Sequence, residues 1–158
     1  MKTLQIEEGK ARNLYKNASS EFKTILEDTF GKDFFAGKVT DCIKTYEDAC
    51  TELGTEPIDE ATMKSAGFTD DEIVYRKIKT ITEALNEGWK PNWSDSNQKK
   101  WQPYFNTVSP SGFAFVGVTY YRYAGPTAGN ASRLCFKSEE LAAYAGKQFT
   151  ELYKDFII

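Results

Sequence analysis

The sequence predicts an α+β fold in which an N-terminal helical layer packs with a small antiparallel sheet and a C-terminal helix. Apolar residues recur at helical spacing through the N-terminal two-thirds of the chain. Residues 113–123 are then rich in Phe, Val, Thr and Tyr, as strands are. A last apolar stripe at helical spacing follows Ser138. At 158 residues the chain has the usual length of one domain, so we predict a single α+β domain over residues 1–158.

Capping residues and terminal glycines mark the expected helices before residue 88. These helices are 7–17, Ser19 or Ser20 to Gly31, Thr40 or Asp41 to Gly54, and Asp59 to Ala66. The strongest local signal is Thr69 followed by Glu72, which form a capping box. Apolar residues at helical spacing follow this box, so we expect a long helix that ends at Gly88.

Beyond residue 88 the pattern changes from helices to strands. Residues 89–103 are polar and contain all three tryptophans, which indicates an irregular loop held by aromatic rings. The expected strands are residues 104–108, 113–123 and 132–137. Gly117 within the longest strand suggests a bulge or a close backbone approach. Ser138 caps the last helix, which we expect to continue to Phe156, and Gly146 within it lets another element pack close.

Composition excludes several classes of function. The chain has 20 basic and 23 acidic residues, so its net charge of −3 argues against non-specific DNA binding. It has no histidine, and therefore lacks the commonest general base and metal ligand. The three cysteines, Cys42, Cys50 and Cys135, fit no zinc pattern and are interpreted as buried thiols in a reducing compartment. We expect no cofactor and no metal.

The chain also lacks the apolar stretches that direct a protein to a membrane. The first eight residues contain no signal-peptide core, and no run of apolar residues is long enough for a transmembrane helix. We therefore expect a cytoplasmic protein that does not enter a membrane.

Four segments carry a resemblance to other sequences: residues 43–50, 81–91, 132–141 and 144–156. In these segments the chain resembles an uncharacterised family found in gut-bacterial phages and in the genomes of their hosts. The family has no assigned activity, so the resemblance implies no catalytic residue. It implies a phage or mobile-element protein made in the cytoplasm of a bacterial host. Small phage proteins of this kind often act on host pathways or defence.

Aromatic residues interleaved with cations are the main candidate for a binding site. Rings beside Lys or Arg can stack a base and neutralise a phosphate. The same residue types are enriched at protein interfaces, and they also suit a core that covers a small sheet. The candidate ligand-binding residues are Trp89, Trp93, Trp101, Tyr104, Tyr121, Arg122 and Arg133. Lys90, Lys99 and Lys100 lie among them in the sequence and add to the cations available.

A loop of small residues, 125–133, offers a second way to hold an anion. It combines flexible backbone donors with the guanidinium of Arg133. No Gly-Lys-Ser/Thr follows, so it is not a P-loop. An ordinary connection between strands explains the same composition.

We therefore expect a non-enzymatic binding protein that acts on a host component, either by contact with a host protein or by sequestering a nucleotide-like ligand. A structural or virion-associated phage protein is one alternative. An enzyme that uses a carboxylate or Lys base is another, although no catalytic residue is indicated. A homo-oligomer is compatible with each hypothesis.

Overall fold

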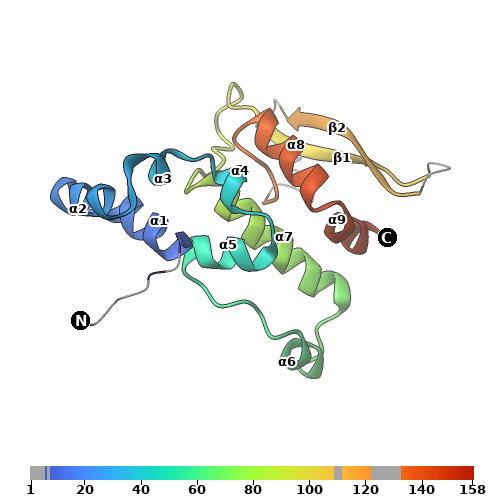
Figure 1. The fold of residues 1–158 in the computed structure, drawn as a ribbon. Helices are drawn as coiled ribbons and strands as arrows, with labels where there is room; N and C mark the ends of the chain where they lie inside the picture. The colour runs from blue at the N-terminus through green and yellow to red at the C-terminus, as the bar shows by residue number, and fades with distance from the viewer. Residues whose placement is uncertain (1–5, 7, 109–111, 122–132) are drawn as a thin grey trace. The chain divides into compact units, whose positions relative to one another are not determined.

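The computed structural model describes residues 6, 8–108, 112–121 and 133–158 (Figure 1). It confirms the α+β class, because the chain forms N-terminal helices, a two-stranded antiparallel sheet and helices at the C-terminal end. Backbone contacts divide the chain into two compact units, Met1–Pro57 and Ile58–Ile158, and each is described by itself. The single domain over residues 1–158 stays a prediction.

The first unit is helical. Its helices are α1 (Glu8–Asn17), α2 (Ser20–Phe30), α3 (Lys32–Ala36), α4 (Val39–Cys42) and α5 (Tyr46–Leu53). Ser19 caps α2 and Gly31 ends it, as predicted. The prediction of one helix from Thr40 or Asp41 to Gly54 is wrong, because the helix is interrupted between α4 and α5. The break has a local cause: Asp48 Oδ2 accepts from the backbone N–H groups of Lys44 and Thr45, so Thr45 starts a new helix with its own capping box.

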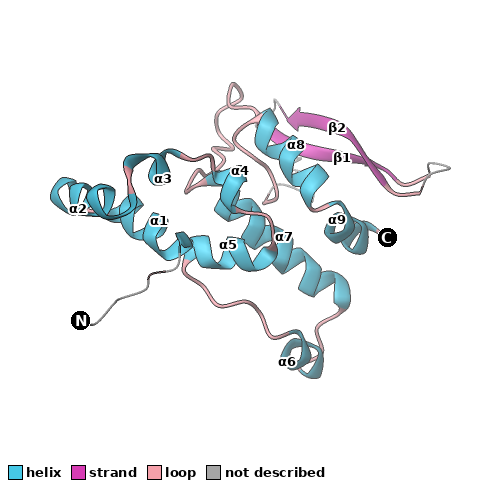
Figure 2. Ribbon diagram, in the orientation of Figure 1, coloured by secondary structure: helices cyan, strands magenta, loops and turns pink. Residues whose placement is uncertain are grey.

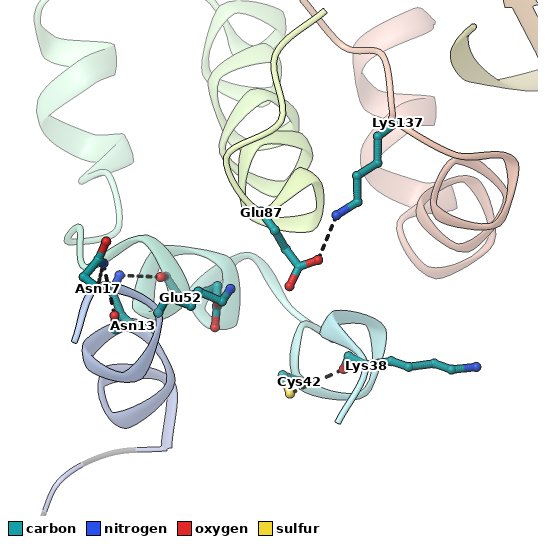
Figure 3. Close-up of polar contacts among 8 residues, drawn as sticks. Asn13, Asn17, Lys38, Cys42, Glu52, Glu87 and Lys137 are labelled. Carbon is teal, nitrogen blue, oxygen red and sulfur yellow. Dashed lines mark hydrogen bonds and ion pairs between the residues drawn. The ribbon is translucent and has the colours of Figure 1, made fainter. Parts of the chain in front are cut away.

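Polar and aromatic contacts hold this unit together. The Asn13 side chain of α1 donates to the backbone oxygen of Glu52 in α5 at 2.8 Å (Figure 3). Lys16 pairs with the Glu52 carboxylate, which is buried. The rings of Tyr15 and Phe35 stack with centroids 4.1 Å apart, so the short helix α3, which the sequence pattern did not reveal, also packs on α1.

The second unit begins with a helical hairpin. Helix α6 (Glu60–Ser65) is capped by Asp59, and helix α7 (Asp70–Asn86) begins with the predicted Thr69–Glu72 capping box. Ion pairs of Lys77 with Glu60 and of Lys64 with Asp70 join the two helices. Helix α7, the longest among the described residues, is thus anchored at its start by local contacts.

The sheet of the second unit consists of β1 (Lys100–Asn106) and β2 (Ala114–Tyr121), paired antiparallel (Figure 2). Tyr104 pairs with Gly117 and Phe105 pairs with Phe115, so Val116 is the extra residue of a bulge, as Gly117 suggested. Strand β1 begins earlier than expected, which brings residues 100–103 out of the predicted loop.

The expected strand at 132–137 is reduced to one bridge in the described residues. Phe136 exchanges two backbone hydrogen bonds with Trp101, at 3.0 and 2.8 Å, on the edge of β1. Residue 132 lies outside the described part of the chain. This bridge lies between Phe136 and Trp101 and brings the segment that begins at Arg133 beside β1.

The C-terminal segment forms two helices where we expected one. Ser138 caps α8 (Glu139–Gln148), as predicted, and Phe149 separates it from α9 (Thr150–Ile157). Helix α8 packs on both strands, and α9 packs on α7. Gly146 is buried where α8 meets the sheet, because a Cβ there would lie 2.4 Å from the ring of Phe115. Gly146 therefore allows the close packing that its place in the sequence indicated.

Apolar residues from α7, residues 134–136, α8 and α9 form the core of this unit. They include Ile73, Ile78, Ile81, Leu85, Leu134, Phe136, Leu141 and Tyr153. No described helix is both long enough and apolar enough to cross a bilayer.

Replacing Gly146 with Ala tests the contact between α8 and the sheet. The new Cβ would also lie 2.8 Å from Pro103 Cβ, so one element must move. We expect Gly146→Ala to lower the free energy of unfolding by about 1–3 kcal/mol, measured by urea titration, although Ala favours helix more than Gly does.

The double variant Gly146→Ala with Phe115→Leu serves as the control. A smaller side chain at position 115 makes room for the new Cβ, so the two changes should be less damaging together than the sum of the single changes. Additive losses would show that the Phe115 contact is not the cause.

Candidate functional site

The C-terminal end of α7 is joined to residues 135–137 by the side chain of Asn86. This side chain is buried, with 4% of its surface exposed. Its Nδ2 donates to the backbone oxygen of Cys135 at 2.8 Å, and its Oδ1 accepts from the backbone N–H of Lys137 at 3.0 Å. We call these two bonds the Asn86 bridge. One amide thus donates to one backbone group and accepts from another two residues away, so the two bonds set the position of one segment against the other.

The backbone turns sharply immediately after the Asn86 bridge. Glu87 is left-handed, with φ of 50°, and Gly88 has φ of 83°. The N–H of Trp89 then donates to the oxygen of Asn86 at 2.9 Å. The carboxylate of Glu87, which lies within this turn, accepts from Lys137 Nζ at 2.8 Å (Figure 3). The turn therefore places Trp89 next to the segment that the Asn86 bridge holds.

The loop after Trp89 is organised around a buried lysine. Lys100 is only 1% exposed, and its ammonium donates to the backbone oxygens of Asp95 and Gln98, both at 2.8 Å. The same ammonium lies 5.5 Å from the ring centroid of Trp93, within cation–π range. Lys100, which the sequence placed among the available cations, thus donates to backbone oxygens inside the protein and does not line the cavity described next.

Trp89 and Trp93 line an open cavity between α7, the loop after it and residues 133–135. Its volume is about 510 Å³, which is within the range of small-molecule sites. Three cations, Lys79, Lys90 and Arg133, also line it. We call it the tryptophan cavity. Both indoles are half-buried, so each presents part of its surface to solvent.

The cations of the tryptophan cavity are available to a ligand. Lys79, Lys90 and Arg133 are exposed, and none of them forms an ion pair with another described residue. Together with two indoles they suit a ligand that has a planar ring and negative charge. Glu83, which is exposed and lies one helical turn beyond Lys79, adds an acceptor for N–H groups.

Cys135 adds an uncharged group to the wall of this cavity. It is buried, and burial raises the pKa of its thiol to about 11, with a small opposing effect of Lys100. The thiol is therefore protonated at neutral pH and is not an activated nucleophile. Of the other cysteines, Cys50 is buried as predicted, whereas Cys42 is partly exposed.

The structure brings together three of the predicted ligand-binding residues and separates two others. Trp89, Trp93 and Arg133 line one cavity. Trp101 and Tyr104 lie on β1 and do not line it. Tyr104 is 61% exposed on the sheet.

Trp101 belongs to a separate aromatic cluster. Its ring centroid is 4.8 Å from that of Tyr120, and Lys99 Nζ lies 4.9 Å from the Tyr120 centroid. Tyr121 ends β2 in register with Lys100, and its side chain lies outside the described part of the structure. Arg122 and residues 125–132 of the proposed anion-binding loop also lie outside it.

Sequence reasoning missed the contribution of α7 to this cavity. Lys79, Glu83 and Asn86 are spaced i, i+4 and i+7, which places them on one side of the helix. Polar residues at this spacing are also typical of a solvated helix surface, so the pattern by itself carries no functional signal.

The described residues offer no metal site, since no group of three or more Cys, Asp or Glu side chains is placed to hold an ion. No family model, curated protein or solved structure matches the chain. The phage-associated family therefore remains a hypothesis, and the case for a function depends on the chemistry of the cavity.

Removing the Asn86 side chain tests the bridge. Asn86→Ala leaves the Cys135 oxygen and the Lys137 N–H buried or half-buried without their partner. We expect the free energy of unfolding to fall by about 2–4 kcal/mol, measured by urea titration. Asn97→Ala is the matched control, because Asn97 is exposed, and it should change stability by less than about 0.5 kcal/mol. Equal effects of the two changes would contradict a structural role for the bridge.

Lys100→Met tests the buried ammonium. Met retains most of the apolar volume but leaves the oxygens of Asp95 and Gln98 without a donor. We expect a loss of about 2–4 kcal/mol in thermal or urea unfolding. Lys99→Met is the control, since Lys99 is exposed. A stable Lys100→Met protein would show that the loop does not depend on this charge.

Proposed function

We propose that this protein binds a small anionic ligand with a planar aromatic ring, of the nucleotide class, in the tryptophan cavity. One observation carries the proposal: Trp89 and Trp93 share a cavity with Lys79, Lys90 and Arg133, none of which forms an ion pair with a described residue. A nucleotide has a base that can stack on the tryptophans and a phosphate that can pair with the cations.

The two halves contribute in different ways. Stacking of a base on an aromatic side chain contributes about 1–3 kcal/mol and tolerates any base. Lys and Arg add charge-assisted hydrogen bonds to phosphate, and Arg can form two at once. Since the cations are exposed, we expect their part of the affinity to depend on ionic strength.

The concave shape favours a small molecule over a protein partner. A stable protein interface buries about 800 Å² on each partner, in a broad patch with an apolar centre. The tryptophan cavity is an open hollow of about 510 Å³ and carries three cations and an exposed carboxylate, Glu83. These features favour the nucleotide-like ligand among the partners that the sequence suggests.

The biological setting that we propose follows from the resemblance to phage proteins. In the cytoplasm of a bacterial host, a non-enzymatic phage protein with this cavity would act by sequestering a nucleotide that the host uses, including one used in defence. This role requires only tight binding.

Calorimetric titration with AMP, GMP, CMP and UMP tests the binding site. We expect at least one of them to bind in a 1:1 complex, and Trp89→Ala to weaken that binding by at least about tenfold, the equivalent of 1.4 kcal/mol. Tyr104→Ala is the control, because it removes an exposed ring that does not line the cavity, and it should change affinity by less than about twofold.

Inorganic phosphate provides a second control, since it should bind more weakly than the nucleotide by the contribution of the stacked base. Affinity for the nucleotide should also fall when salt is raised from about 50 to about 200 mM. Absence of binding at millimolar concentration by all four nucleotides and by nucleotides that carry a second base would refute the proposal.

A further inference from the structure

We infer that the ligand is a dinucleotide, in which two bases are joined through phosphate and lie along α7. This inference rests on the proposed function and names its substrate class. The observation behind it is a second cavity, of about 500 Å³, whose lining includes Lys79 and Arg133. The same two cations line the tryptophan cavity, so the two cavities adjoin at a shared positive wall.

The second cavity has its own aromatic pair. The rings of Tyr75 and Phe156 have centroids 5.8 Å apart and are tilted by 36°. Both side chains line the cavity and are half-buried, as the two tryptophans of the first cavity are. We call it the tyrosine cavity. It can therefore offer a second base an apolar surface.

The geometry of α7 orders these groups along one line. Tyr75, Lys79 and Glu83 are spaced i, i+4 and i+8, so they follow one side of the helix. From Tyr75 to Asn86, beside the tryptophan cavity, the helix rises about 16 Å. Rings thus lie toward both ends of this line and the shared cations lie between them.

This order matches the chemistry of a dinucleotide with its bases apart. Each base would lie in one cavity, and the linking phosphate would meet Lys79 and the guanidinium of Arg133. A mononucleotide can fill only one cavity and leaves the other set of rings uncovered.

Carboxylates in the two cavities also favour the placement of the bases there and of the phosphate between them. Asp71 lines the tyrosine cavity and Glu83 lines the tryptophan cavity, and both are exposed. The neighbouring Glu72 is already used by the Thr69 cap, with bonds of 2.9 and 3.1 Å. A free carboxylate accepts from the exocyclic amine or ring N–H of a base and repels a phosphate. Each end also carries one cation, Arg76 in the tyrosine cavity and Lys90 in the tryptophan cavity, but only Lys79 and Arg133 line both cavities, so the middle is the place for a linking phosphate.

The same charges argue against a longer strand. A continuing backbone would carry phosphates past Asp71 and Glu83, whose carboxylates offset the attraction of Arg76 and Lys90 at the two ends. The net charge of the chain is −3, which is also unfavourable for a polyanion. A ligand that ends at two bases avoids both costs.

The experiment compares dinucleotides with mononucleotides by calorimetric titration of the full chain. The probes are linear ApA and GpG, cyclic di-AMP and cyclic di-GMP, with AMP and GMP as references and a single-stranded dodecamer, dA₁₂, as a longer ligand. We expect at least one dinucleotide to bind 1:1 and at least about tenfold more tightly than its mononucleotide, because joining two ligands makes the second contact intramolecular. Comparison of the linear with the cyclic probes shows whether the preferred dinucleotide is an open chain or a ring.

Two variants assign the gain to the tyrosine cavity. Tyr75→Ala should remove most of the dinucleotide advantage and change mononucleotide affinity by less than about twofold, which also shows that the variant is folded. Lys79→Gln should weaken both kinds of ligand, since Lys79 lines both cavities.

The outcomes separate the two proposals. Mononucleotide binding with no gain for any dinucleotide overturns this inference and leaves the proposed function in place. Binding of neither class overturns the proposed function, and this inference with it. Tighter binding of dA₁₂ than of every dinucleotide, or a dinucleotide advantage that survives Tyr75→Ala, also overturns the inference.

Discussion

The Asn86 bridge is the constraint on which the candidate site depends. Two hydrogen bonds from one buried amide join the end of α7 to residues 135–137, which lie 49 and 51 positions further along the chain. Together with the Glu87–Lys137 ion pair and the burial of Leu134 and Phe136, the bridge places Arg133 beside α7, although these residues are distant in sequence. Loss of this amide is costly to stability, because it leaves two backbone groups without their hydrogen-bond partner.

Burial divides the lysines of the second unit into two groups. Lys100 is buried and its ammonium holds a loop by two backbone oxygens, while Lys79 and Lys90 are exposed beside the tryptophan cavity. The difference is one of solvation. A buried ammonium must be satisfied by the protein, whereas an exposed one retains water that a phosphate can displace. Charge alone therefore does not identify a ligand contact, and the burial of each cation decides its role.

The site combines a rigid part with an open part. Helix α7 is held at its start by the Thr69–Glu72 cap and at its end by the Asn86 bridge, so the groups on its exposed side keep their spacing. The aromatic side chains come from three places, which are the loop after α7, α7 itself and α9. Binding energy in such a site comes from stacking and charge on a preorganised frame, which lowers the entropy cost of binding.

The sequence by itself determined the features that depend on near neighbours. The α+β class, the caps of α2, α7 and α8, the bulge near Gly117 and the close approach at Gly146 all follow from local chemistry or from residue size. Only the tertiary structure decided which rings and cations line one cavity, because Arg133 lies some 40 residues beyond Trp89 and Trp93 in the sequence. Local patterns also failed where a side chain competed for the backbone, as Asp48 does between α4 and α5. Periodicity describes one element at a time, whereas a binding site is a relation between elements.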